Sequence, residues 1–102
     1  MSEINGKTMF HFTIRVVLYD NATWEDYKRL ASALAAKNIT DVITADDGAR
    51  YKLPSAEYQC QGELSAEDVR KICSNAATMT GKRHAVLVTA SAGRAWSGLS
   101  RV

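Results

Sequence analysis

The stretch FHFTIRVVLYDNATWEDY, residues 10–27, decides the fold because it encodes a strand, a turn and the start of a helix. Apolar and other residues alternate from Phe10 to Tyr19, which is the period of a strand with one covered face. The even-numbered side chains are all apolar, whereas the odd-numbered ones are mixed. We therefore expect one face to lie on a core and the other to be open to solvent or a partner.

A helix is predicted directly after this strand. Thr23 and Asp26 have the spacing of a capping box, in which each side chain accepts a hydrogen bond from the backbone N–H of the other. Apolar residues then recur at helical spacing from Trp24 to Leu34, and Asn38 suits the helix exit. This stripe, Trp24 included, is expected to lie in the core.

Two short strands and a turn are predicted next. ITDVITA, residues 39–45, is rich in β-branched residues, and DDG at 46–48 is a hairpin signal. ARYKL at 49–53 is the expected partner strand. Pro54 cannot donate to a strand ladder, so we expect a break or bulge there, with the strand resuming at EYQCQ, residues 57–61.

The remaining third of the chain repeats the helix and strand signals. Ser65 and Asp68 form a second predicted capping box, and the apolar stripe after them ends at Gly81. HAVLVTA, residues 84–90, is the last long predicted strand. AWSGL at 95–99 could fold back as a short additional strand.

The element order β-α-β-β-α-β predicts the α+β class and a ferredoxin-like two-layer sandwich. Both helices would cover one face of an antiparallel sheet with strand order 4-1-3-2, and an extra C-terminal strand could be added. With 102 residues the chain is expected to form a single domain at 9–102, preceded by a flexible polar tail at 1–8.

Composition narrows the classes of function. The formal net charge is only +2, so an anion site has to be local rather than a property of the whole surface. No apolar run is long enough to span a bilayer, and the N-terminus lacks the blocks of a signal peptide. Cys60 and Cys73 lack metal-ligand spacing and are expected to be free thiols, so we expect a cytoplasmic protein.

The predicted topology gathers polar side chains at one end of the sheet. The residues expected there are Asp20, Asn21, Asp46, Asp47, Arg50, Lys82, Arg83 and His84. Phosphodiester chemistry uses such a mixture, because a base removes a proton and cations stabilise charge on phosphate. Ordinary roles are also open: acids start helices, Asp-Gly forms hairpins, and cations follow helix ends.

The sequence resembles the GhoS-type antitoxins of type V toxin–antitoxin systems. The features that carry the resemblance are VVLYDN at 16–21, ITADDG at 43–48 with YKLP after it, and LSAEDVRKI at 64–72. The resemblance extends over roughly residues 9–91, which is most of the domain. The resemblance implies a ferredoxin-like fold similar to the Cas2 nucleases of CRISPR systems, and an endoribonuclease that cuts the messenger RNA of a small membrane toxin. It also implies an aspartate at the end of the first strand, here Asp20, and dimer formation.

Two hypotheses follow. In the first, the protein is an endoribonuclease in which RNA crosses the open sheet face. The residues expected to bind RNA are His11, Thr13, Arg15, Tyr19, Lys82 and Arg83, and the catalytic candidates are Asp20, His84 and Arg50. Either Asp20 binds a divalent cation such as Mg²⁺, or His84 acts as base toward the ribose 2′-hydroxyl with Arg50 or Lys82 on the phosphate. The sequence does not separate these routes.

The second hypothesis is a non-catalytic module that forms a homodimer or binds a partner through a sheet edge. The C-terminal residues Trp96 and Leu99 could cover such an edge.

Overall fold

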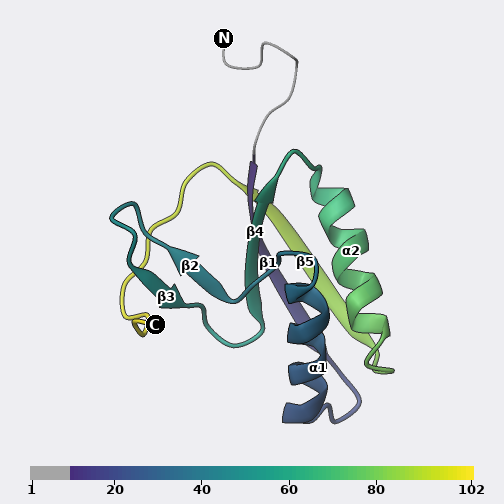
Figure 1. Ribbon diagram of the computed structural model, residues 1–102. Helices are drawn as coiled ribbons and strands as arrows, with labels where there is room; N and C mark the ends of the chain where they lie inside the picture. Colours follow the sequence, from purple (N-terminus) through teal and green to yellow (C-terminus); the bar gives the residue numbers. More distant parts are fainter. Residues whose placement is uncertain (1–9) are drawn as a thin grey trace.

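The structure is a computed structural model that describes residues 10–102 (Figure 1). The predicted tail at 1–8 lies outside the described residues. In chain order, the elements are β1 (Phe10–Leu18), α1 (Trp24–Ala35), β2 (Val42–Thr44), β3 (Arg50–Lys52), β4 (Glu57–Gly62), α2 (Ala66–Thr78) and β5 (His84–Ser91).

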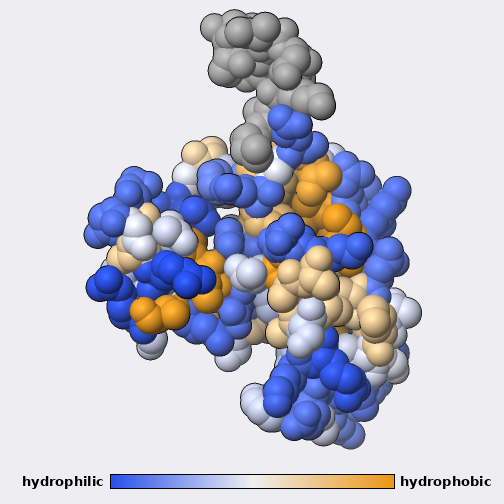
Figure 2. Space-filling model, in the orientation of Figure 1, coloured by the Kyte–Doolittle hydropathy of each residue, from blue (hydrophilic) through white to orange (hydrophobic). Residues whose placement is uncertain are grey.

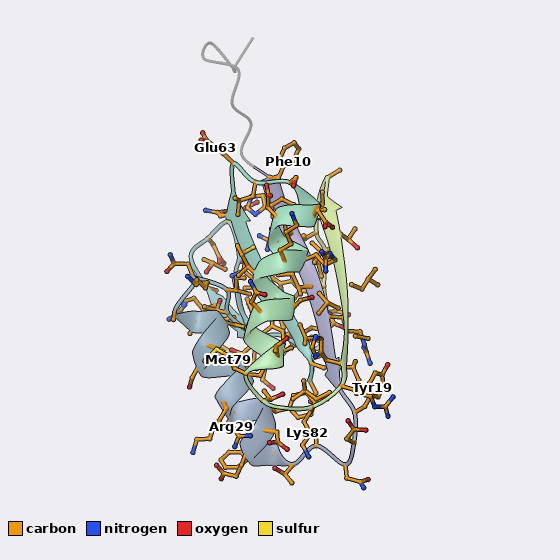
Figure 3. The ribbon with its side chains drawn as sticks, turned by 90° about the vertical axis from the view of Figure 1, so that its right-hand side faces the viewer. Phe10, Tyr19, Arg29, Glu63, Met79 and Lys82 are labelled. Atoms are coloured by element: carbon orange, nitrogen blue, oxygen red, sulfur yellow. The ribbon has the colours of Figure 1, made fainter. Side chains whose placement is uncertain are left out.

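Two antiparallel sheets are present, and β1 is the centre of the larger one. It pairs with β4 on one side and β5 on the other, so the order is β4-β1-β5, while β2 and β3 form a separate hairpin. Both helices lie on one face of the larger sheet (Figures 1 and 3). The α+β class and the helix layer on one sheet face are therefore as predicted.

The predicted four-stranded sheet of order 4-1-3-2 is wrong. The chain turns at Pro54 instead of bulging: Glu57 N–H donates to the Pro54 carbonyl at 3.1 Å, and Ala56 adopts a left-handed φ of 66°. This turn sends β3 and β4 into different sheets. Thr40, just before β2, still pairs with β4 through backbone hydrogen bonds with Gln59 of 3.0 and 2.7 Å, and the Gln59 side chain donates to the Val42 carbonyl of β2 at 2.9 Å.

The C-terminal segment adds to the small sheet, at a different place from the one predicted. Within the described chain, residues 95–99 form no strand, whereas Arg101 pairs with Tyr51 of β3. Two backbone hydrogen bonds of 2.9 Å hold this segment. Lys52 N–H donates to the Ser100 carbonyl, and Val102 N–H donates to the Arg50 carbonyl.

Both predicted capping boxes are confirmed. Thr23 N–H donates to Asp26 Oδ2 at 2.8 Å, and Asp26 N–H donates to Thr23 Oγ1 at 3.3 Å. Ser65 and Asp68 exchange the same two bonds at the start of α2. Helices that begin at fixed residues place their apolar stripes reproducibly over β1.

The core lies between the helices and the covered face of the larger sheet. Its fully buried large side chains are Phe12, Ile14, Val16, Leu30, Leu34, Val69 and Cys73. Trp24 was expected among them, but it is 70% exposed with Lys28 Nζ 4.7 Å from its ring centroid. It starts α1, and this first turn projects past the ends of the strands (Figure 1), so the sheet offers it no packing surface.

The difference in burial between Trp24 and Leu30 can be tested by substitution. We expect Leu30→Ala to lower the free energy of unfolding by about 2–5 kcal/mol, because it leaves a cavity in the core. Trp24→Ala should cost about 1 kcal/mol or less, since an exposed ring loses little beyond its cation contact. Urea denaturation measures both, and equal losses would contradict the exposure of Trp24.

Candidate functional site

Asp20 lies where the loop after β1 meets the loop before β5. Tyr19 N–H donates to the Arg83 carbonyl at 2.7 Å, which extends the β1–β5 pairing by one bond. Asp20 and Asn21 then both adopt left-handed backbone conformations, with φ of 60° and 57°. Aspartate and asparagine tolerate this region better than most residues, which explains the Asp-Asn pair at this turn.

The Asp20 carboxylate is held by Arg83 through both of its oxygens. Oδ1 accepts from Arg83 Nε at 2.9 Å and lies 2.8 Å from Nη2, while Oδ2 accepts from the Arg83 backbone N–H at 3.1 Å. Lys82 Nζ donates to the Asp20 backbone carbonyl at 3.1 Å. The side-chain and backbone hydrogen bonds from Arg83 lower the pKa of Asp20 below its ordinary value of 3.8.

Arg83 also contacts Tyr19, which leaves a cation and an aromatic ring exposed together. The guanidinium carbon lies 5.6 Å from the Tyr19 ring centroid, a cation–π distance. The Arg83 side chain is 76% exposed and Tyr19 is 44% exposed. Tyr19 and Lys82 lie at the same end of the molecule, opposite Phe10 and Glu63 (Figure 3). We call Tyr19, Asp20, Lys82 and Arg83 the rim cluster.

His84 adjoins the rim cluster but belongs to the other sheet face. It lies opposite Leu18, so its side chain is on the helix-covered side with Val86 and Val88. Its Nδ1 is 3.1 Å from the Lys82 carbonyl oxygen. A carbonyl oxygen only accepts, so Nδ1 is the donor in this bond, and in the neutral tautomer that makes this bond Nε2 is the acceptor nitrogen.

The structure separates Arg50 from the rim cluster. Arg50 lies on β3 opposite Thr44, in the small sheet that the turn at Pro54 splits from β4. Asp46 and Asp47 belong to the hairpin turn of the same sheet, and this hairpin lies apart from the loop after β1 (Figure 1). The acid and cations that meet are therefore Asp20, Lys82 and Arg83.

The predicted RNA-binding residues of β1 share the sheet face that the helices leave uncovered. His11 is opposite Gln61 and Ser91, and Thr13 is opposite Gln59 and Thr89, so polar rows cross this face. The next row joins Arg15, Glu57 and Leu87, with Arg15 Nη1 3.7 Å from the Glu57 carboxylate. Tyr19 continues the same face into the rim cluster.

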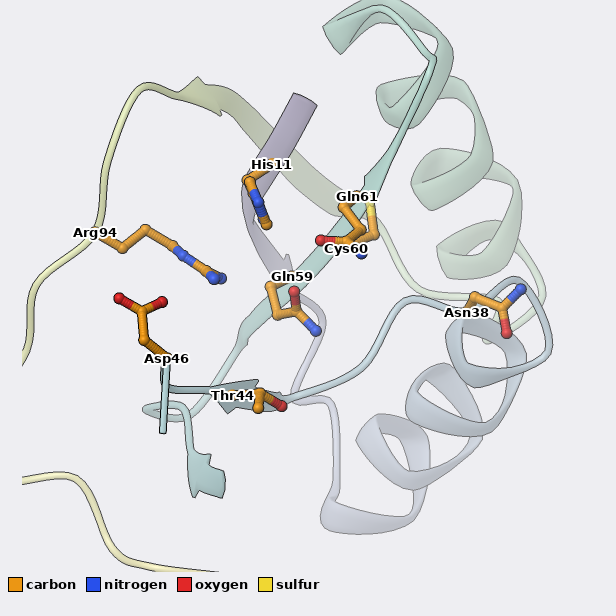
Figure 4. A pocket seen from close by; sticks show the side chains of 8 residues that line it. All are labelled: His11, Asn38, Thr44, Asp46, Gln59, Cys60, Gln61 and Arg94. Carbon is orange, nitrogen blue, oxygen red and sulfur yellow. The ribbon is translucent and has the colours of Figure 1, made fainter. Parts of the chain in front are cut away.

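The sequence did not predict the cleft between the larger sheet and the hairpin. His11 and Gln59 of the sheet, Thr44 and Asp46 of the hairpin, and Arg94 after β5 line a cavity of about 480 Å³ (Figure 4). An adjoining cavity of about 560 Å³ is lined by the segment from Ala92 to Trp96. Figure 2 shows the hollow between the hairpin side and the main body.

No sequence pattern predicts this cleft, because part of its lining comes from segments that have the pattern of ordinary turns. His11 was assigned to an open face, yet its Nδ1 is buried and has no hydrogen-bond partner within the described chain. Asp46 was assigned to the hairpin signal at 46–48, and Arg94 was not among the predicted site residues. The segment that carries Arg94 is held by the pairing of residues 100–102 with β3 and by the contact of the Trp96 and Tyr51 rings, whose centroids are 5.7 Å apart.

The donor set around Asp20 does not fit a divalent cation. Both carboxylate oxygens face Arg83, and Lys82 lies beside them, so a metal ion would have to displace a guanidinium and approach an ammonium group. Among residues 10–102, no three or more histidine, cysteine, aspartate or glutamate side chains are grouped as metal ligands.

Comparison with family models, with curated proteins and with solved structures finds no match for this chain. In the part of the chain that is described, no helix is both long and apolar enough to cross a bilayer.

The Asp20–Arg83 bond predicts a pH-dependent contribution to stability. Because the folded-state pKa of Asp20 is lowered, the contribution is complete above the unfolded value near 3.8 and is lost as pH falls through the folded value. Wild type should therefore melt a few degrees above Asp20→Asn at neutral pH. The two should converge below pH 3.8, as thermal melting across pH would show.

Asp46→Asn is the matched control, since its carboxylate makes no hydrogen bond or ion pair with residues 10–102. It should melt with wild type at every pH. A constant gap between wild type and Asp20→Asn down to the lowest pH would contradict the ionic role of Asp20.

Proposed function

We propose that this protein binds single-stranded RNA across its open sheet face and cleaves it, as an endoribonuclease of the GhoS type acting on toxin messenger RNA. The observation that carries the RNA part is the exposed Arg83–Tyr19 pair, fixed by Asp20 at the end of a polar sheet face. An aromatic ring stacks on a base and a guanidinium binds phosphate, which are the two contacts that unpaired RNA offers.

Asp20 serves as a positioning residue in this proposal. Its carboxylate binds Nε and Nη2 of Arg83, and so directs the exposed guanidinium across Tyr19. Arg83 Nη1 makes no bond with another described residue and is free to donate to a phosphate oxygen. A guanidinium already held in place loses less side-chain entropy when RNA binds.

The donor geometry favours the metal-free route. In this route the ribose passes round the end of the sheet at the rim cluster, because His84 lies on the helix-covered side, and Nε2 of the neutral imidazole takes the proton of the 2′-hydroxyl. The 2′ oxygen bonds to the adjacent phosphorus while the bond from phosphorus to the 5′ oxygen breaks, and water protonates the leaving oxygen. The products are a 2′,3′-cyclic phosphate and a 5′-hydroxyl end, and Arg83 stabilises the charge that grows on the phosphate.

Cleavage of a labelled single-stranded RNA tests this route. We expect the wild-type rate to be unchanged by EDTA and His84→Gln to lower it about 100- to 10,000-fold, the usual contribution of a general base. Arg83→Gln should weaken RNA binding and reduce its salt dependence, since one phosphate contact is lost. The matched control is Arg70→Gln, because Arg70 is an exposed α2 residue paired with Glu67.

Melting curves establish that each variant is folded. Full cleavage by folded His84→Gln would exclude His84 as the base, and cleavage abolished by EDTA would exclude the metal-free route. If Arg83→Gln and Arg70→Gln bound RNA alike, the rim cluster would not be the RNA site.

A second candidate function, a module that pairs through a sheet edge, is favoured by β5. Within residues 10–102 no strand pairs with its outer edge, and residues 85–91 contain no charged residue or proline to block such pairing. Leu87 is 65% exposed at the centre of this strand. Two copies could join their β5 strands antiparallel and bury both leucines.

Light scattering over a range of concentrations tests the pairing. The second candidate predicts a dimer for wild type and a monomer for Leu87→Lys, because the like charges would meet across the two-fold axis. Leu64→Lys, which alters an exposed apolar residue between β4 and α2, should remain dimeric. A wild-type monomer at all concentrations would contradict the pairing and would leave the RNA proposal unaffected.

A further inference from the structure

Two opposite charges in the cleft have no hydrogen-bond or ion-pair partner among residues 10–102. Arg94 extends from the segment after β5 and Asp46 from the hairpin turn, and both side chains point into the same cavity (Figure 4). Neither side chain makes a hydrogen bond or an ion pair with any residue from 10 to 102. A guanidinium and a carboxylate across a cavity can each bind a different edge of one ligand.

The sheet side of the cavity is polar and largely fixed. Gln59 Nε2 donates to the Val42 carbonyl at 2.9 Å and to Thr40 Oγ1 at 3.1 Å, which leaves its side-chain carbonyl oxygen as an acceptor. His11 Nδ1 is buried without a partner among the described residues. An unsatisfied buried nitrogen is unfavourable, so a ligand that bonds it recovers free energy on binding.

The size and the charges together restrict the ligand. A volume of about 480 Å³, with a neighbouring 560 Å³, is in the range of small-molecule and nucleobase sites. Asp46 can only accept hydrogen bonds and Arg94 can only donate them. The ligand that satisfies both groups best carries two adjacent donors on one edge and two adjacent acceptors on another.

Guanine is the base with this pattern. Its N1–H and its N2 amine are adjacent donors for a carboxylate, and its O6 and N7 are adjacent acceptors for a guanidinium. Adenine offers only one acceptor and one donor on the edge that Arg94 would read, and cytosine offers a carboxylate only its single amine. Bases in single-stranded RNA are unpaired, so both edges of guanine are accessible.

We propose that this cleft binds a guanine base of single-stranded RNA, with Asp46 on the N1 and N2 donors and Arg94 on O6 and N7. The inference rests on the proposed RNA function and adds a base preference to it. His11 lies eight residues before Tyr19 on the same face, roughly 26 Å at the usual rise of a strand. One RNA strand laid along β1 could therefore reach both the rim cluster and this cleft.

Fluorescence anisotropy with labelled uridine oligonucleotides that carry one central variable base tests the preference. Cleavage is prevented by a 2′-deoxy substitution at every sugar except that of the variable base, whose 2′-hydroxyl is methylated. We expect guanine to bind about tenfold or more tightly than adenine, cytosine or uracil, and inosine, which lacks the N2 amine, to lose most of this advantage. Asp46→Asn and Arg94→Gln should each abolish the guanine preference.

Asp47→Asn is the control for the acid, since the asparagine oxygen can still accept the Ala49 N–H that Asp47 binds at 2.9 Å. Arg70→Gln is the control for the cation, because Arg70 is an exposed residue of α2 paired with Glu67 and does not line the cleft. Both should keep the guanine preference. Melting curves check that Asp46→Asn and Arg94→Gln are folded. Because the two substitutions lie in different segments, a local folding defect in one variant would not explain the loss of guanine preference in both.

The outcomes separate this inference from the RNA proposal. Binding of every oligonucleotide with equal affinity would overturn the guanine site and leave RNA binding at the rim cluster standing. A preference for cytosine, or a guanine preference kept by folded Asp46→Asn, would also overturn it. If no oligonucleotide bound, both the RNA proposal and the guanine site would fall.

Discussion

The rest of the structure depends on the backbone pairing of β1 with a strand on each side. From His11 to Arg15 it pairs with both β4 and β5, and its even-numbered side chains, from Phe12 to Leu18, lie buried under the two helices. A one-residue slip in this register would expose the whole apolar set. The same register fixes the odd-numbered side chains on the uncovered face and brings the loop at Asp20 beside the loop at Lys82 and Arg83.

The hydrogen bonds between Asp20 and Arg83 fix the exposed side chains at the end of β1 and β5. Two left-handed residues turn the chain out of β1, and the carboxylate then binds the backbone and the side chain of Arg83. An aspartate at the end of a first strand suggested a catalytic residue that binds a metal ion. Here its surroundings are cationic, which favours the ionised form and suits a residue that positions a guanidinium.

Local patterns in the sequence were sufficient for most elements. The alternation in β1 and the capping boxes at Thr23 and Ser65 are short-range signals, and both were read correctly. The Pro54 turn was read as a break within one strand, because a proline does not reveal how far the chain changes direction. That one error changed the sheet order and put Arg50 at the wrong end of the sheet.

The candidate site was predictable only in part, because it depends on which strands and segments pair. Asp20, Lys82 and Arg83 meet because β1 and β5 pair, and the order of the predicted elements indicated that pairing. The cleft depends on contacts between residues far apart in sequence, such as Arg101 with Tyr51, where neither residue carries a signal for the other. The burial of Trp24 was also predicted wrongly, because the apolar stripe of a helix does not indicate where the neighbouring sheet ends.

The central claim is that unpaired RNA lies on the uncovered sheet face and the rim cluster. Amide chemical-shift mapping of the ¹⁵N-labelled protein with a non-cleavable single-stranded oligonucleotide tests it most directly. We expect the largest shifts at Tyr19, Arg83 and His84 and along β1, with small shifts on the exposed sides of α1 and α2. Shifts confined to the helices, or absent at a saturating concentration of oligonucleotide, would contradict it.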